Sequence, residues 1–236
     1  MRHIGVVIAL EAEARALTPR KLRLGLVEDL DGGVRVQVCG MGPAAAAAAA
    51  LALAESGVAA LAIYGVAGAL DPQLLSGALL CPRMVLDQHG ARYAVDPAWR
   101  LRLAARLGGQ TLLDHTLLTV AEPLLTPQAK AEARREFKAA AVDMESAAVA
   151  EVAQSQGLPF LALRAIADGA QDSIPPPLAG AVDRWGRAKP AAVATALLSH
   201  PLLIPRLPHL ASTMNRACAT LRRAAQAAGP GLAYEV

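Results

Sequence analysis

The chain has 236 residues, of which 23 are basic and 20 acidic, giving a formal net charge of +3. This length suits one α/β domain with a full core, and the balanced charge, without a basic run interleaved with aromatics, argues against a nucleic-acid partner. Apolar residues make up 54% of the chain but aromatic residues only 3%. Alanine, leucine and valine therefore dominate, which suits helices packed closely on a sheet.

The cysteines Cys39, Cys81 and Cys218 are odd in number and far apart, so neither a disulfide framework nor a zinc site is indicated. The first apolar run, residues 4–10, is followed at once by acidic residues rather than by a cleavage site. No stretch reaches the length of a membrane span without interruption. We therefore expect reduced thiols and a cytoplasmic location.

Hydrophobic periodicity predicts alternating strands and helices along one domain, 1–236, without an interdomain linker. The expected strands are 2–9, 22–28, 34–39, 61–64, 78–87, 91–95, 111–120, 139–142 and 160–166. The expected helices are 11–17, 44–55, 97–107, 127–137, 145–156, 188–199 and 207–227. The last two form a C-terminal helical segment, 188–236, and the prolines at 175–177 predict an extended loop before it.

The stretch 140–168 carries three acidic residues, Asp143, Glu145 and Asp168, in apolar surroundings, and its pattern predicts strand, helix, strand. A parallel βαβ unit brings both strand ends to one edge of a sheet. We therefore expect Asp143, Met144, Glu145 and Asp168 at one rim, where open α/β sheets bind ligands. The alternatives are structural: Asp143 as a helix cap, Glu145 complementing the helix dipole and Asp168 simply ending a strand.

Two features of the first third of the chain are further candidates. Glu13 falls in the first turn of the helix 11–17, where it either complements the helix dipole or reaches a site. Arg15, two residues on, faces either an anion or solvent. Gly40 and Gly42 lie between a strand and a helix, where backbone N–H groups can face an anion, but the third glycine of a dinucleotide motif and the lysine of a P-loop are lacking.

The segments Val-Asp-Met-Glu-Ser at 142–146 and Leu-Arg-Ala-Ile-Ala-Asp at 163–168 resemble the nucleoside phosphorylase and nucleosidase superfamily. That superfamily includes purine nucleoside phosphorylases and methylthioadenosine/S-adenosylhomocysteine nucleosidases. The resemblance covers nearly the whole chain and is weakest over 86–119. It implies an α/β, three-layer αβα fold with a mixed, partly barrel-like central sheet, a homo-oligomer, and no cofactor beyond inorganic phosphate as an alternative co-substrate.

The resemblance also implies roles for individual residues. Asp168 would be the general acid that protonates the purine at N7, with a pKa raised by a strand end poor in cations. Glu145 would bind the ribose hydroxyls, with Met144 beneath the sugar and Asp143 beside them. Glu13 would activate the attacking water. Arg164 would either position Glu13 or bind an anion.

Two loops that the superfamily uses for substrate differ here from its usual pattern. Residues 65–70 read Gly-Val-Ala-Gly-Ala-Leu where the superfamily has Gly-Ser/Thr-Ala-Gly-Gly-Leu, so Val66 replaces a hydroxyl, while Gly68 is kept. The loop 121–124 lacks the aromatic that usually stacks on the base, and Pro123 or Leu124 would supply that apolar contact. The turn at Gly40 to Gly42 would lie near ribose or phosphate.

Several of these differences from the usual pattern agree with one branch of the superfamily, the hopanoid-biosynthesis-associated phosphorylase. The chain resembles this branch at 9–15, 142–146, 158–164 and at His200-Pro201. The resemblance implies release of adenine from adenosylhopane, leaving ribosylhopane or its phosphate. The apolar segment 200–208 either packs on the domain or a partner subunit, or offers a surface for a lipid-like substrate. A peripheral contact with the inner membrane would then be largely hydrophobic.

Several alternatives remain open from the sequence. Glu13 favours water as the nucleophile, whereas Arg15, Arg164 and the Gly40 to Gly42 turn favour phosphate. A nucleosidase for methylthioadenosine, S-adenosylhomocysteine or futalosine is the first alternative function. A non-catalytic nucleoside-binding protein on the same fold is the second, although binding alone does not need an acid such as Asp168.

Overall fold

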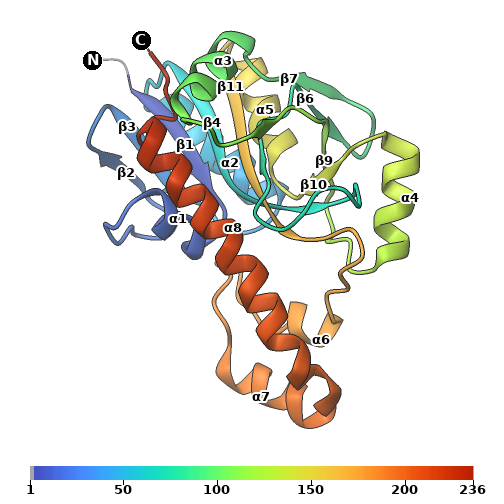
Figure 1. Cartoon of the computed structure of the whole chain (residues 1–236). Coiled ribbons are helices and arrows are strands. Elements are labelled where there is room, and N and C mark those ends of the chain that lie inside the picture. Colours follow the sequence, from blue (N-terminus) through green and yellow to red (C-terminus); the bar gives the residue numbers. More distant parts are fainter. Residues whose placement is uncertain (1–2, 236) are drawn as a thin grey trace.

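A mixed β-sheet forms the centre of the structure, and helices cover both of its faces (Figure 1). The computed structural model describes residues 3–235. The predicted start of the first strand at Arg2 and the two ends of the predicted domain 1–236 lie outside these described residues. This architecture confirms the predicted α/β class with a mixed sheet between helical layers.

The sheet contains strands from almost the whole length of the chain up to residue 168. The strands are β1 Ile4–Ile8, β2 Val27–Leu30, β3 Val34–Val38, β4 Ala60–Ala69, β5 Leu79–Leu80, β6 Met84–Asp87, β7 Arg92–Ala94, β8 Leu112–Leu113, β9 Leu117–Thr119, β10 Ala141–Asp143 and β11 Phe160–Asp168. The helices are α1 Glu11–Leu17, α2 Pro43–Glu55, α3 Pro97–Arg106, α4 Pro127–Phe137, α5 Ser146–Ser155, α6 Pro176–Ala179, α7 Pro190–Ser199, η1 (a 3₁₀ helix) Pro201–Arg206 and α8 Leu207–Ala228.

Strand β4 is the central strand of the sheet, because other strands pair with both of its edges. Strand β11 pairs with β4 in parallel from Leu61 to Gly68. The opposite edge is shared, since β1 pairs in parallel with residues 60–63 and β10 pairs antiparallel with Gly68 and Ala69. The sheet therefore divides between residues 63 and 68, and backbone groups of β4 are left open there for other partners.

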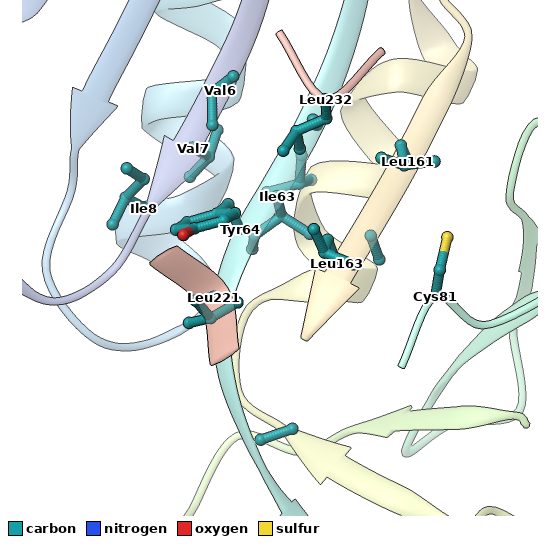
Figure 2. Close-up of a cluster of buried hydrophobic side chains, with 14 of the residues drawn as sticks. Val6, Val7, Ile8, Ile63, Tyr64, Cys81, Leu161, Leu163, Leu221 and Leu232 are labelled. Atoms are coloured by element: carbon teal, nitrogen blue, oxygen red, sulfur yellow. The ribbon is translucent and has the colours of Figure 1, made fainter. Parts of the chain in front are cut away.

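The core lies on both sides of this sheet and is almost entirely aliphatic. On one side α2 packs against α5, and on the other α8 packs against α1 and β11. Figure 2 shows side chains of β1, β4 and β11 meeting Leu221 of α8 and Leu232 of the C-terminal segment, all of them buried. Burial on both faces explains why β1, β4 and β11 consist of nearly continuous apolar residues.

Several sequence-based expectations differ from the structure. The expected strand 22–28 lies instead at Val27–Leu30, and the expected strands 78–87 and 111–120 are each divided into two short strands.

The parallel βαβ unit is wrong, because β10 runs antiparallel to β4 whereas β11 runs parallel to it. The turn expected after Tyr64 is instead a continuation of β4 to Ala69. The prolines at 176 and 177 begin the short helix α6 rather than prevent it, because the first helical positions need no N–H donor. Among residues 3–235, no helix combines the length and apolar character that crossing a membrane requires.

Candidate active site

A cavity of about 230 Å³ lies where the sheet divides. It is lined by Ala9, Leu10, Glu13, Met41, Val66, Ala67, Gly68, Val120, Pro123, Leu124, Lys130, Val142, Asp143, Met144, Glu145, Asp168 and Ile174. A wider depression of about 790 Å³ lies elsewhere, among the exposed arginines of α4 and the residues 114–116. We place the site in the smaller cavity, because carboxyl groups converge on it from three separate segments of the chain: the start of α1, residues 143–145 and the end of β11.

Glu13 joins the N-terminus of α1 to the open edge of β4. Its Oε2 accepts a hydrogen bond of 2.8 Å from the N–H of Leu10, the residue before the helix, and its Oε1 accepts one of 2.7 Å from the N–H of Val66. The division of the sheet leaves that N–H without a strand partner. Glu13 therefore complements the start of the helix, as its position in the first turn predicts, and also faces the cavity.

Glu145 stands at the N-terminal end of α5 and is held from two sides. Its Oε1 accepts a hydrogen bond of 2.9 Å from the N–H of Gly42, and its Oε2 lies 3.6 Å from Nη2 of Arg164. Arg164 is fully buried and also lies 2.6 Å from Oδ2 of Asp143. This arginine is thus enclosed by carboxylates beneath the cavity, as a buried cation requires.

Asp143 is the centre of a hydrogen-bond network that orients this end of the cavity. Its Oδ1 accepts from the hydroxyl of Thr119 at 2.7 Å and from the N–H of Ser146 at 3.3 Å, and its Oδ2 accepts from the hydroxyl of Ser146. The N-cap of α5 is Glu145, not Asp143 as the helix-cap alternative expected, although Asp143 accepts the N–H of Ser146 at the first helical position. Because the oxygens of Asp143 are occupied in this way, it serves mainly to position Arg164 and the start of the helix.

Asp168, at the end of β11, lies opposite Gly68, its register partner on β4. A Cβ atom built on Gly68 would come within 3.0 Å of Oδ2 of Asp168, so only glycine allows this approach without displacement. The Oδ2 atom accepts a hydrogen bond from Nζ of Lys130, a buried lysine of α4. The expectation of a strand end poor in cations is wrong.

Burial alters the proton affinity of the carboxyl groups at the cavity. Loss of hydration raises the pKa of Glu145 to about 7, against the opposing effect of Arg164. Burial likewise raises the pKa of Glu13 above its ordinary value, with Arg164 again opposing, and it raises the pKa of Asp168 against the opposing effect of Lys130. The cavity therefore contains carboxyl groups that can carry protons above the usual carboxylate range, which acid and base catalysis needs.

The structure brings most of the sequence-based candidates together. Eight of them line the cavity: Glu13, Gly68, Pro123, Leu124, Asp143, Met144, Glu145 and Asp168.

The other four candidates, Arg15, Arg164, Gly40 and Gly42, do not line the cavity. Arg15 is exposed and pairs with Glu11 across one helical turn at 2.7 Å, because the next turn of α1 points away from the cavity. Arg164 lies beneath the carboxylates. The turn at Gly40 and Gly42 has no N–H free for an anion: these groups donate to Ala9, to Arg184 from the intervening Met41, and to Glu145.

Lys130 is the main residue of the cavity that sequence reasoning missed. Lysine is rarely buried, and the charged sequence of this helix does not indicate that Lys130 is buried. One signal was available, because Lys130, Ala133 and Phe137 follow the Thr126 cap at helical spacing and so share a face of α4. Within residues 3–235, no group of three or more His, Cys, Asp or Glu side chains is arranged to hold a metal ion.

The family model of the phosphorylase superfamily matches residues 10–199. No curated protein matches the chain. Among solved structures, futalosine hydrolase of Helicobacter pylori has a TM-score of 0.70 at 17% identity, covering 96% of each chain.

Two nucleosidase structures are equally similar. The methylthioadenosine/S-adenosylhomocysteine nucleosidase of Neisseria meningitidis, in complex with methylthio-immucillin-A, has a TM-score of 0.70 at 18% identity over 99% of each chain. An aspartate-to-asparagine mutant of the Helicobacter pylori nucleosidase, with 5′-methylthioadenosine in its active site, has a TM-score of 0.71 at 17% identity, covering 96% of this chain and 97% of that one. At these identities the likeness shows a shared fold.

Proposed function

Because the chain belongs to the phosphorylase superfamily, we propose that it hydrolyses the N-glycosidic bond of a purine nucleoside. The observation that carries this proposal is the meeting of Asp168, Glu13 and Glu145 around one small cavity. They come from the end of β11, the start of α1 and the start of α5. The similar structures that hold methylthioadenosine or an immucillin support the same class of ligand.

In the proposed reaction, three carboxyl groups have three different roles. Asp168 donates its proton to N7 of the purine, so the base departs neutral as its bond to C1′ breaks. Water attacks C1′ and gives its proton to Glu13, which is held by two backbone N–H groups. Glu145 accepts hydrogen bonds from the ribose hydroxyls. The products are the free base and a ribose with a new hydroxyl at C1′.

The charge distribution favours water over phosphate as the nucleophile. Carboxyl groups of Glu13, Asp143, Glu145 and Asp168 line the cavity, against a single lining cation, Lys130, which already pairs with Asp168. Arg164 is enclosed beneath them and Arg15 faces away. A phosphate dianion beside Glu13 would meet repulsion with no free cation to offset it. Inorganic phosphate is therefore not needed as a co-substrate in this proposal.

For the substrate, we propose adenine release from a nucleoside whose 5′ substituent is apolar, with adenosylhopane as the specific candidate from the hopanoid branch. The cavity of about 230 Å³ is below the usual range of small-molecule sites, so a pentacyclic tail would have to extend beyond it. Pro123, Leu124 and Ile174 supply apolar lining in place of an aromatic. The small volume also favours the alternative, a short substituent such as that of methylthioadenosine or futalosine.

We propose that such a tail, and a peripheral membrane contact, would use α7 and η1. Figure 1 shows these elements standing off from the sheet beside the start of α8. Leu198 and Leu202 are each 85% exposed there, and Ile204 is 54% exposed. Residues 184–234 contain basic residues and no acidic ones. An apolar tip on a basic segment suits contact with an anionic lipid surface.

The experiment that tests the proposal measures adenine release from adenosines with 5′ substituents of increasing size, from methylthioadenosine to adenosylhopane, with and without phosphate. We expect release without phosphate, and a kcat/KM that rises with the apolar tail. Activity limited to short substituents would replace the hopanoid substrate by a small one. Binding without release from any of them would leave a nucleoside-binding protein.

The membrane contact has its own test, by sedimentation with vesicles that contain anionic lipid. Leu202→Ser should weaken sedimentation several-fold. Leu101→Ser is the matched control, because Leu101 is 67% exposed on α3. Equal sedimentation of the wild type and both variants would remove α7 and η1 as the contact.

A further inference from the structure

Lys130 is a buried cation that lines the candidate cavity, and every one of its donors has a partner. Its side chain is 1% exposed. Besides Oδ2 of Asp168, its Nζ donates to the backbone oxygen of Gly169 at 2.8 Å and to that of Asp172 at 3.1 Å. An ammonium group has three N–H donors, so these three acceptors define its position. Helix α4 is thereby joined to the segment that follows β11.

The lysine leaves the two oxygens of Asp168 in different situations. Oδ2 is occupied by Lys130. Within residues 3–235, no side chain donates a hydrogen bond to Oδ1, and the further donor to this carboxyl group is the backbone N–H of Asp168 itself. Both oxygens lie beside Gly68, which lines the cavity, because a Cβ there would be 3.0 Å from Oδ2 and 3.3 Å from Oδ1. The oxygen that can hold a proton toward a bound base is therefore Oδ1.

We propose that Lys130 is a positioning residue for the general acid, fixing Oδ2 of Asp168 so that Oδ1 presents its proton to the departing base. The inference rests on the proposed function, since it assigns a partner to the acid of that reaction. One proton moves, from Oδ1 to N7 of the purine, and Lys130 keeps its own three. The chemistry needs this partner because a carboxyl that rotates freely would lose its alignment with N7.

The lysine also sets the pH range in which Asp168 can act. A cation in contact with a carboxyl group lowers its pKa, whereas burial raises it; at Asp168 burial is the larger effect and Lys130 the main opposing one. The other charged groups nearby are Asp172, which raises the pKa of Asp168, and His209 of α8, whose Nε2 lies 3.1 Å from Asp172. Asp143 and Glu145 face the same cavity from β10 and the start of α5.

The direction of the expected pH effect follows from the role of the acid. Asp168 must carry a proton to act, so kcat falls as pH rises through its pKa. Removing the positive charge at position 130 raises that pKa, and the alkaline limb of the kcat profile then moves to higher pH. An opposite charge typically lowers a carboxyl pKa by one to three units, so the expected movement is about one pH unit or more.

The test compares Lys130→Gln, which keeps a donor but loses the charge, with Lys130→Arg, which keeps both. In Lys130→Gln we expect the alkaline limb to move up by about one pH unit, and kcat to fall roughly tenfold or more with KM close to that of the wild type. Lys130→Arg should keep the limb in place. Arg135→Gln is the charge control, because Arg135 is exposed on the same helix.

An unmoved limb in folded Lys130→Gln, or an equal movement in Lys130→Arg, would overturn the proposal. If Lys130→Gln does not fold, the result for Lys130→Arg decides alone. An alkaline limb of the kcat profile that moves to higher pH despite the retained charge overturns the proposal, and an unmoved alkaline limb supports it.

A second readout does not depend on turnover. The folded-state pKa of Asp168 already lies above its ordinary 3.8, and loss of the lysine raises it further. Stability that depends on protonated Asp168 is lost as pH rises, so the Tm deficit of Lys130→Gln should grow from about pH 4 upward. A deficit that does not vary with pH overturns the charge pairing. If the wild type releases no base from any nucleoside, the proposed function fails, while this Tm comparison still decides whether Lys130 tunes Asp168.

Discussion

The backbone N–H of Gly42 donates a hydrogen bond of 2.9 Å to Oε1 of Glu145, a residue 103 positions later in the chain. Gly42 has a φ of 100°, a conformation that glycine adopts without strain, and its N–H points toward the carboxyl group of Glu145. A glycine turn before a helix is often an anion site. Here the anion that it binds is the protein's own carboxylate, so the turn fixes the proposed ribose-binding group rather than a phosphate.

Replacing the proposed general acid should strongly reduce turnover while leaving nucleoside binding intact. Asp168→Asn keeps the shape of the side chain and the acceptor for Lys130 but has no proton to give. We expect kcat to fall at least about 100-fold, with the affinity for a nucleoside analogue little changed. Kinetics and calorimetric binding check this, with Asp114→Asn, in the wider depression, as the control. A variant that releases base as fast as the wild type would exclude Asp168 as the acid.

A methyl group at Gly68 should displace the acid without disrupting the fold. The new Cβ would come within 3.0 Å of Oδ2 of Asp168, closer than ordinary contact. We expect Gly68→Ala to lower kcat by about 100-fold, since a displacement of about 1 Å at a reacting group has effects of that size, with a Tm near that of the wild type. Gly180→Ala is the matched control, because its Cβ would meet only ordinary contacts at 3.7 Å. Equal kcat values for both variants would contradict this geometry.

The buried carboxyl of Glu145 should leave a signature in the pH dependence of stability. Its folded pKa of about 7 lies above the ordinary value of 4.5, so the stability that its protonated form contributes is complete below pH 4.5 and is lost as pH rises toward 7. Glu145→Gln lacks this titration. The Tm of this variant minus that of the wild type should therefore increase between pH 4.5 and 7.

Glu11→Gln provides the contrast for that experiment. The pKa of Glu11 is lowered by its hydrogen bond with Arg15, so the stability that it contributes is present above its unfolded pKa and lost only in acid. Its Tm difference from the wild type should stay constant between pH 5.5 and 7. A Glu145→Gln difference that is equally constant over this range would show that Glu145 is ionised throughout.

Local pattern predicted the elements well, and the helices 11–17 and 127–137 have the predicted bounds. Pairing between strands was harder to predict. A strand, a helix and a strand within 140–168 favour a parallel unit, but β10 pairs antiparallel with the far end of β4. This antiparallel pairing depends on the length of β4. That length could not be predicted, because the glycines and alanines of 65–69 favour a turn on propensity alone.

The prediction that Asp143, Glu145 and Asp168 meet was correct although its reasoning was not. Gly68 pairs with Val142 on one edge of β4 and with Asp168 on the other, so the two segments converge without being neighbours in the sheet. Lys130 and the partners of Arg164 could not be predicted in the same way. Their roles depend on which side chains face each other across long stretches of sequence, which periodicity does not specify.

Hydrolysis with Glu13 as the base is best tested by measuring adenine release by the wild type and Glu13→Gln in phosphate-free buffer. Glutamine can still accept the N–H groups of Leu10 and Val66 but cannot take a proton from water. We predict steady release by the wild type without phosphate and a loss of about 100-fold or more in Glu13→Gln. Nucleoside binding should be retained in Glu13→Gln, and the control Glu11→Gln should have near-normal rates. Unchanged turnover in Glu13→Gln, or wild-type release only when phosphate is added, would contradict this mechanism.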